Sequence, residues 1–109
     1  MKFLIPADQI KQLYSCRGNS GCFASNRITV DGMKIGYMYR ETPDSNFPDS
    51  GWRFFAGDES DVYTANPDNF NIFDLNTVCN YDETIINYLD APYETAWIWN
   101  GESFVLDCE

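Results

Sequence analysis

The chain has 109 residues, with 17 acidic and 7 basic side chains and no histidine, which gives a formal net charge of −10. This length fits one domain, and a hydrophobic fraction of 44%, with 17% aromatic residues, supplies one core and argues against a disordered chain. The acidic balance disfavours nucleic acid and anionic membranes as direct partners, because lysine and arginine must neutralise both, and it favours a basic protein partner.

The charge is distributed unevenly along the chain. Residues 1–40 hold six of the seven basic residues and two acidic ones, whereas residues 41–109 hold fifteen acidic residues and one basic residue, Arg53. Any acidic surface must therefore come from the second part of the chain. Such a surface either attracts a basic partner or only keeps the protein soluble, and the sequence is consistent with both.

The four cysteines, Cys16, Cys22, Cys79 and Cys108, form no C-x-x-C pair. Their number and spacing do not fit a disulfide scaffold or a structural zinc site, so we expect reduced thiols in a reducing compartment. The apolar run at residues 3–5 is too short for a signal peptide, and no stretch reaches transmembrane length. These features predict a cytoplasmic protein.

The first elements combine a helix with strands. Residues 6–14 are predicted to be a short helix, because proline suits the first turn and the apolar residues share one face. Residues 22–25 indicate a short strand. Residues 28–40 are predicted to form a β-hairpin around Asp31-Gly32, since this dipeptide supplies the positive φ angles of a type I′ turn. Gly36 marks a bulge or a close backbone approach.

The middle of the chain alternates loops and short elements. Residues 41–50 hold two prolines and three acids, which indicates a loop. Residues 52–56 follow as a strand, and Asp58 then caps a short helix over residues 59–65.

The last elements are a short strand, a helix and a hairpin. Residues 72–73 indicate the strand, and residues 83–89 are predicted to be a helix with Asp82 as its cap. Residues 95–106 are predicted to be a hairpin around Asn100-Gly101, the strongest short-range turn signal.

These elements predict a single α+β domain over residues 1–109, with a mainly antiparallel sheet and two or three short helices. On the strand at 95–99, Trp97 and Trp99 share one face and Ala96 and Ile98 share the other. Because both faces are apolar, either this strand is covered on both sides or one face is a contact surface.

The chain lacks the usual residues of hydrolytic and metal catalysis. A cysteine nucleophile normally needs a histidine, and the chain has none. Neighbouring carboxylates are expected by chance in so acidic a chain, so only a cleft with two carboxylates at catalytic spacing would indicate hydrolysis. An EF-hand loop starting at Asp68 fails, because Phe73 and Cys79 stand where glycine and glutamate are needed. We therefore predict a binding protein without a metal site, not an enzyme.

Aromatic residues flank an arginine in two segments, 37–40 and 52–54. A small-ligand pocket with one convergent charge is one interpretation, lined by Tyr37, Tyr39, Arg40 and Trp52. The alternative is structural, since a buried arginine is costly unless it is paired. In that case Arg40 forms an ion pair with Asp49 or Asp58.

Several segments resemble one known family. The most specific is Gly51-Trp52-Arg53-Phe54-Phe55-Ala56-Gly57-Asp58, supported by the runs at 25–32, 36–41, 66–69, 80–82 and 89–92. These segments resemble the immunity protein 33 family over about residues 22–106, with residues 1–21 as a preceding helix and loop. The resemblance implies a bacterial protein that protects its maker from a polymorphic toxin. It implies no cofactor and no catalytic residues.

Charge and resemblance together lead to one main hypothesis. The protein is expected to bind a cognate toxin domain, for which the charge favours a basic surface, and to block its active site or substrate groove. The expected rim contacts are Asp44, Asp49, Glu59 and Asp61, with Trp52 as an anchor. The alternative is a small-molecule-binding or regulatory module that uses the aromatic pocket.

Overall fold

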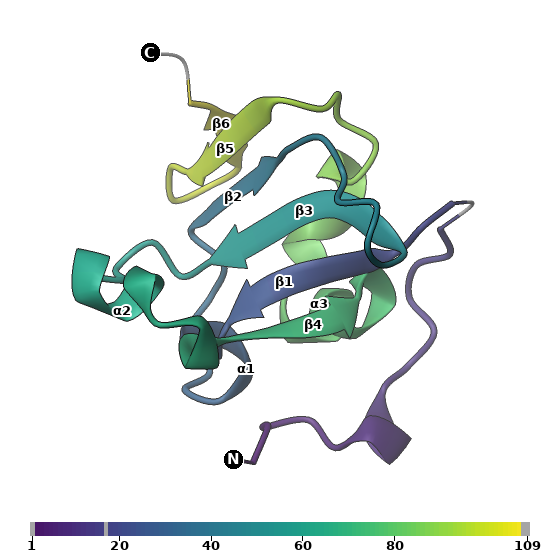
Figure 1. The fold of residues 1–109 in the computed structure, drawn as a ribbon, viewed down its shortest axis with the longest axis vertical. Coiled ribbons are helices and arrows are strands. Elements are labelled where there is room, and N and C mark those ends of the chain that lie inside the picture. Colours follow the sequence, from purple (N-terminus) through teal and green to yellow (C-terminus); the bar gives the residue numbers. More distant parts are fainter. Residues whose placement is uncertain (1, 17, 108–109) are drawn as a thin grey trace.

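The computed structural model describes residues 2–16 and 18–107. It contains a six-stranded sheet in the order β4-β1-β3-β2-β5-β6 (Figure 1). The β1–β3 pair is parallel, and the remaining pairs are antiparallel. The predicted α+β class with a mainly antiparallel sheet is therefore confirmed. The strands are β1 (Gly21–Ser25), β2 (Tyr37–Arg40), β3 (Asp49–Phe55), β4 (Phe70–Asp74), β5 (Thr95–Trp99) and β6 (Phe104–Leu106).

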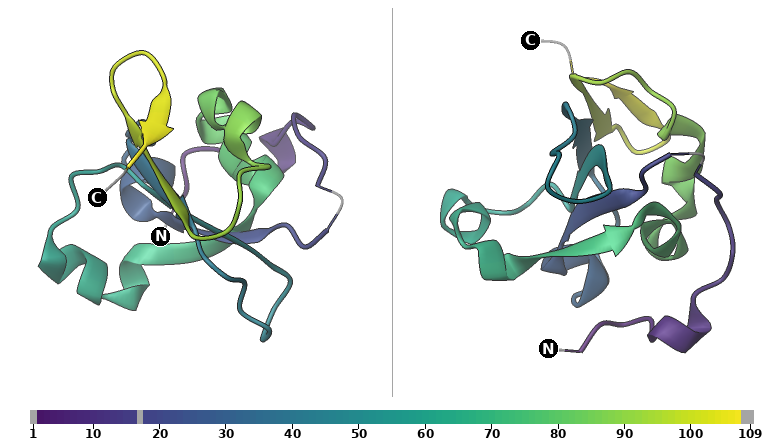
Figure 2. Two further views of the ribbon diagram at one scale, coloured as in Figure 1. Left: turned by 90° about the horizontal axis from the view of Figure 1, so that it is seen from above. Right: turned by 45° about the vertical axis from the view of Figure 1, so that its right-hand side comes forward.

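Short helices flank the sheet on both sides. In Figure 1, α3 lies behind the strands, and the view from above in Figure 2 places α2 on the opposite side of the sheet from α3. One face is therefore covered by helices, and the other is covered only at one end. The α-helices are α1 (Asn26–Thr29), α2 (Asp61–Ala65) and α3 (Leu75–Tyr81), and the 3₁₀ helices are η1 (Ala7–Gln9), η2 (Pro67–Asn69) and η3 (Glu83–Tyr88).

Side chains at the N-termini fix where the helices begin. Ser60 and Asp74 accept hydrogen bonds from backbone N–H groups in the first turns of α2 and α3. Asp82 caps η3 in the same way, as the sequence predicted. The predicted cap of α2 was wrong, because Ser60 and not Asp58 takes this position. Capped ends stabilise short helices by satisfying N–H groups that otherwise have no partner.

The core lies between the sheet and the helices α1, α3 and η3. Trp52 and Phe54 of β3 are 0% exposed and stack on each other, with ring centroids 5.8 Å apart. The indole N–H of Trp52 donates to the carbonyl of Leu89 at 3.1 Å. Trp97 and Trp99 pack against the same core. On β5, the tryptophans therefore face the core, while Ile98 on the other face is 43% exposed.

Residues 28–40 do not form the predicted hairpin. Ser25 caps α1, so the chain turns into a helix directly after β1, and Ile28 enters the core with 0% exposure. Gly32 has a positive φ of 80°, and its N–H donates to the carbonyl of Ile28 just after the helix. The glycine therefore serves a helix end and not a hairpin turn. The hairpin at 95–106 is confirmed, because β5 and β6 pair there.

The predicted helix at residues 6–14 is also wrong, because only η1 is helical in this segment. Two asparagines of α3 hold the residues after η1 in an extended form. The N–H groups of Leu13 and Tyr14 donate to Oδ1 of Asn76 at 2.8 and 3.0 Å. The N–H of Lys11 donates to Oδ1 of Asn80 at 2.9 Å. These bonds occupy amides that a helix would have used internally.

Two glycines allow the backbone to approach closely beside the sheet. A Cβ atom on Gly36 would clash with the carbonyl oxygen of Ala56, which confirms the predicted close approach. Gly51 has a φ of 91°, and a Cβ atom there would clash with the carbonyl oxygen of Glu41. Larger residues at either position would therefore push β2 and β3 apart.

The buried thiols are expected to be inert in the native protein. Cys22 and Cys79 are 0% exposed, and burial raises the pKa of both, that of Cys79 to about 12. Because thiolates are the reactive form, iodoacetamide should modify the half-buried Cys16 in the native state and the two core cysteines only in denaturant. Peptide mass spectrometry after labelling shows which cysteines have been modified. Native labelling of Cys22 at the rate of Cys16 would contradict the core packing.

Candidate binding site

The face of the sheet turned away from α3 carries a continuous set of apolar side chains and one arginine. Strand alternation places these residues opposite the core residues, and register brings them together, since Tyr37 pairs with Phe55 and Ile98, and Tyr39 pairs with Arg53 and Ala96. We call this surface the open face. It consists of Phe23, Tyr37, Tyr39, Arg53, Phe55, Phe70, Ile72, Ala96, Ile98 and Val105.

Three aromatic rings form a cluster at the middle of the open face. The ring centroids of Tyr37, Tyr39 and Phe55 lie 5.8 to 6.0 Å apart, and all three side chains are half-buried. Three shallow hollows adjoin this aromatic cluster, and each is lined by two of its members. Such rings expose large, rigid apolar surface beside concavities, which is typical of a protein-binding surface.

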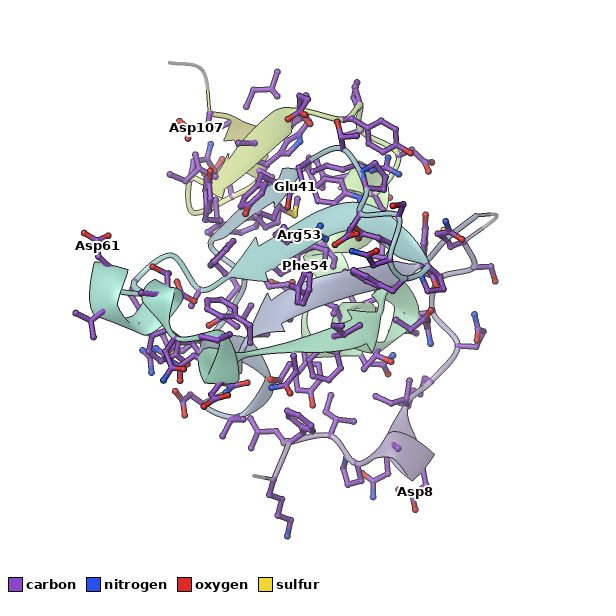
Figure 3. The ribbon with its side chains drawn as sticks, in the orientation of Figure 1. Asp8, Glu41, Arg53, Phe54, Asp61 and Asp107 are labelled. Atoms are coloured by element: carbon purple, nitrogen blue, oxygen red, sulfur yellow. The ribbon has the colours of Figure 1, made fainter. Side chains whose placement is uncertain are left out.

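A buried ion-pair network lies beside the aromatic cluster. The two terminal nitrogens of Arg53 each donate to a carboxylate oxygen of Asp49 at 2.8 Å. Its Nε donates to Glu41 at 2.7 Å. The side chains of Arg53 and Asp49 are 8% and 0% exposed, whereas that of Glu41 is 44% exposed. Figure 3 shows Glu41 and Arg53 close together on the near side of the sheet. The network therefore presents one accessible carboxylate.

The Asp49 carboxyl should make stability depend on pH. Burial alone would raise its pKa, but hydrogen bonds from Arg53 and from the N–H groups of Asp44 and Gly51 lower the pKa from 3.8 to about 2. A lowered native pKa stabilises the fold above the unfolded value, and this contribution is lost as the pH falls from about 4 to about 2. The shift corresponds to about 2 kcal/mol. In urea denaturation across this pH range, the free energy of unfolding should fall more steeply with pH for the wild type than for Asp49→Asn. Equal pH dependence in the two proteins would contradict the assignment.

The predicted rim residues are not gathered at one place. Asp44 and Asp61 are exposed, and Figure 3 shows Asp61 on α2, well away from Arg53. Asp49 is 1% exposed and occupied by Arg53. The half-buried Glu59 accepts hydrogen bonds from the backbone of residues 56 and 57. Trp52 lies in the core with 0% exposure and presents no surface for a partner.

The predicted pocket residues divide between the two faces. Tyr37, Tyr39 and Arg40 line one shallow hollow, but Trp52 lies on the covered side. The guanidinium of Arg40 donates to the carbonyls of Ser50 and Ala91 at 2.9 and 2.8 Å. The expected ion pair of Arg40 with an aspartate is therefore wrong, because backbone carbonyls satisfy it instead.

The two aspartates considered for Arg40 have other partners. Asp49 pairs with Arg53, and Asp58 pairs with Arg27 at 2.5 Å. Sequence reasoning also missed Glu41 and Phe55 as site residues. Phe55 follows Arg53 by two positions, so strand alternation would have placed both on one face. No local signal links Glu41 to Arg53, because their contact depends on how β2 pairs with β3.

Within residues 2–16 and 18–107, no group of three or more histidine, cysteine, aspartate or glutamate side chains is arranged to hold a metal ion. No helix in the same ranges is long and apolar enough to cross a bilayer. The fold and the site thus define a small α+β domain with a partly uncovered aromatic sheet face. The model of the Immunity protein Imm33 domain matches residues 22–106, and the chain belongs to this family. No curated protein and no solved structure matches the chain.

Family membership confirms the resemblance of the sequence to immunity proteins and supports an immunity function. It also implies a cognate toxin as partner. The matched range starts at the second residue of β1 and ends at the last residue of β6, so it covers the six-stranded sheet except for Gly21 and leaves out the N-terminal segment that packs on α3.

Proposed function

We propose that the protein neutralises its cognate toxin domain by direct binding through the open face. The observation that carries this proposal is the aromatic cluster on a sheet face that helices leave largely uncovered. Ile72, Ile98 and Val105 extend the same face and are 57%, 43% and 39% exposed. An apolar patch of this kind on a small domain marks a contact surface.

The charge of the chain supports a basic partner surface. The net charge is −10, and acidic side chains border the open face at Glu41, Asp58, Glu94 and Asp107. Such a rim accelerates encounter with a basic toxin and disfavours acidic competitors. A toxin that acts on nucleic acid has a basic substrate groove, and it would suit this rim well.

We also propose that the protein protects stoichiometrically and not as an enzyme, and that it does so in the cytoplasm of the producing cell. The core thiols have raised pKa values, and the Asp49 carboxylate is held by Arg53 and backbone amides. Groups held in this way are poor nucleophiles and poor proton carriers.

Titration of the purified toxin domain with this protein tests the proposal. Toxin activity should fall linearly and reach zero near one molar equivalent, and the mixture should elute as one equimolar complex in size-exclusion chromatography. Full protection at a small fraction of an equivalent would indicate catalysis. Absence of both a complex and protection would exclude binding as the mechanism.

A further inference from the structure

The open face contains one hollow whose chemistry is more specific than that of a general contact surface. This hollow lies between β3 and the α2–η2 segment and has a volume of about 470 Å³. We call it the aromatic pocket, lined by Tyr39, Glu41, Arg53, Phe55, Thr64 and Phe70. We propose that it receives one cationic side chain, arginine or lysine, of the toxin. This inference rests on the proposed function, because the toxin supplies the side chain.

The walls of the aromatic pocket are suited to a cation. The rings of Tyr39 and Phe55 are stacked with centroids 5.8 Å apart, and Phe70 meets Phe55 edge-on at 5.6 Å. Aromatic faces attract lysine and arginine through the ring quadrupole, and this attraction strengthens as water is excluded. Phe70 belongs to β4 and Tyr39 to β2, so the sheet and not a single loop sets the shape of the pocket.

The charge balance of the pocket also favours a cation over an anion. Arg53 directs its donors to Asp49, Glu41 and the carbonyl of Trp52, so an anionic ligand would have to displace existing bonds. The two carboxylates and one guanidinium leave one excess negative charge. One oxygen of Glu41 accepts from Arg53, and the side chain, which lines the pocket, is 44% exposed. A second cation can therefore bind Glu41 without disturbing Arg53.

A neutral apolar side chain fits this pocket less well. It would cover the exposed carboxylate of Glu41 and remove its water without supplying a donor, and that loss is costly for a charged group. An arginine or lysine supplies the donor and covers the rings with its aliphatic stem. The pocket thus selects for a toxin side chain with a positive charge at its tip and an apolar stem.

Probe binding to the wild-type protein tests the pocket without the toxin. Two-dimensional amide NMR spectra of isotope-labelled protein would be recorded during titration with N-acetyl-arginine methylamide, and separately with its uncharged isostere N-acetyl-citrulline methylamide. We expect saturable shifts at Phe55, Thr64 and Phe70 for the arginine probe, with affinity about tenfold higher than for citrulline. Equal shifts for both probes, or arginine shifts confined to other residues, would overturn the proposal.

Matched variants connect the pocket to the toxin. Glu41→Gln keeps an acceptor for Arg53, and Asp49 still neutralises that guanidinium, so the fold should persist. Asp8→Asn removes an exposed carboxylate from η1, and Figure 3 shows Asp8 far from Glu41 and Arg53. We expect Glu41→Gln to remove the preference for arginine and to weaken toxin binding about tenfold, with little effect of Asp8→Asn. If both variants weaken toxin binding equally, Glu41 acts only through the overall negative charge of the protein, and the assignment is overturned.

The two proposals fail in different ways. If the toxin binds wild type and Glu41→Gln equally well and the arginine probe does not bind, the aromatic pocket is wrong while binding of the toxin stands. If the arginine probe binds the pocket and no toxin complex forms, the pocket is a cation site and the proposed function is wrong.

Discussion

Asp49→Asn is expected to lower the free energy of unfolding by about 3 kcal/mol. Removing one partner of a buried ion pair typically costs about 3–5 kcal/mol, because the other charge stays buried without compensation. Here the lower end applies, since Glu41 still pairs with Arg53 at 2.7 Å. Urea denaturation followed by tryptophan fluorescence measures the change, because Trp52 lies in the core.

The matched control is the ion pair between Arg27 and Asp58, whose side chains are 30% and 48% exposed, respectively. Exposed pairs contribute little, because water screens them, so Asp58→Asn should leave the urea midpoint unchanged within error. If Asp49→Asn proved as mild as Asp58→Asn, the network would not hold β3 in place, and the geometry beside the aromatic cluster would need another cause.

Tyr37→Ala is expected to weaken toxin binding at least thirtyfold, roughly 2 kcal/mol, the loss typical of a central aromatic residue in an interface. Tyr37 contacts both other rings of the aromatic cluster, and it lines two of the three hollows. Isothermal titration calorimetry with the toxin domain measures the change, and a urea midpoint for each variant shows that the fold persists.

The control for Tyr37 is another exposed tyrosine outside the open face. Tyr93 is 50% exposed and packs against the guanidinium of Arg40, with 4.4 Å between the guanidinium carbon and the ring centroid. Tyr93→Ala should bind the toxin as the wild type does. Equal losses in both variants, or a loss only in Tyr93→Ala, would place the contact elsewhere.

The sequence predicted those elements whose partners are neighbours along the chain. The hairpin at 95–106 forms as expected, because β5 and β6 are separated by one short turn at Asn100-Gly101. The Asp31-Gly32 signal was interpreted as a hairpin turn, yet the same dipeptide also suits a helix end. The helix end forms because Ser25 caps α1 and Ile28 is buried in the core. Burial of Ile28 depends on tertiary contacts, which the local sequence does not contain.

Non-local contacts explain what the sequence left out. The parallel pairing of β1 with β3 joins residues about thirty positions apart in the sequence. The helix α3 was missed because Asn76 and Asn80 have low helix propensity. In the structure their side chains hold the N-terminal segment, and Val78 and Cys79 fill the core. Tertiary contacts therefore override a weak local signal.

The candidate site was found in part from the sequence. Tyr37 and Tyr39 were identified because aromatic residues stand beside an arginine there, and their spacing of two positions places both on one face of a strand. Trp52 looked equally suitable as an anchor, but alternation alone cannot tell which face is covered. Apart from α1, the covering helices come from residues 75–88, far along the chain, and they enclose Trp52 instead of the tyrosines.

An NMR footprint of the toxin complex tests the central claim most directly. Amide spectra of the isotope-labelled protein would be compared with and without one equivalent of unlabelled toxin domain. We expect the largest shifts at β2, β3 and β5, at residues of the open face, with little change in α3 and in the N-terminal segment that packs on it. Shifts concentrated in α3, η3 or the N-terminal segment would contradict binding through the open face.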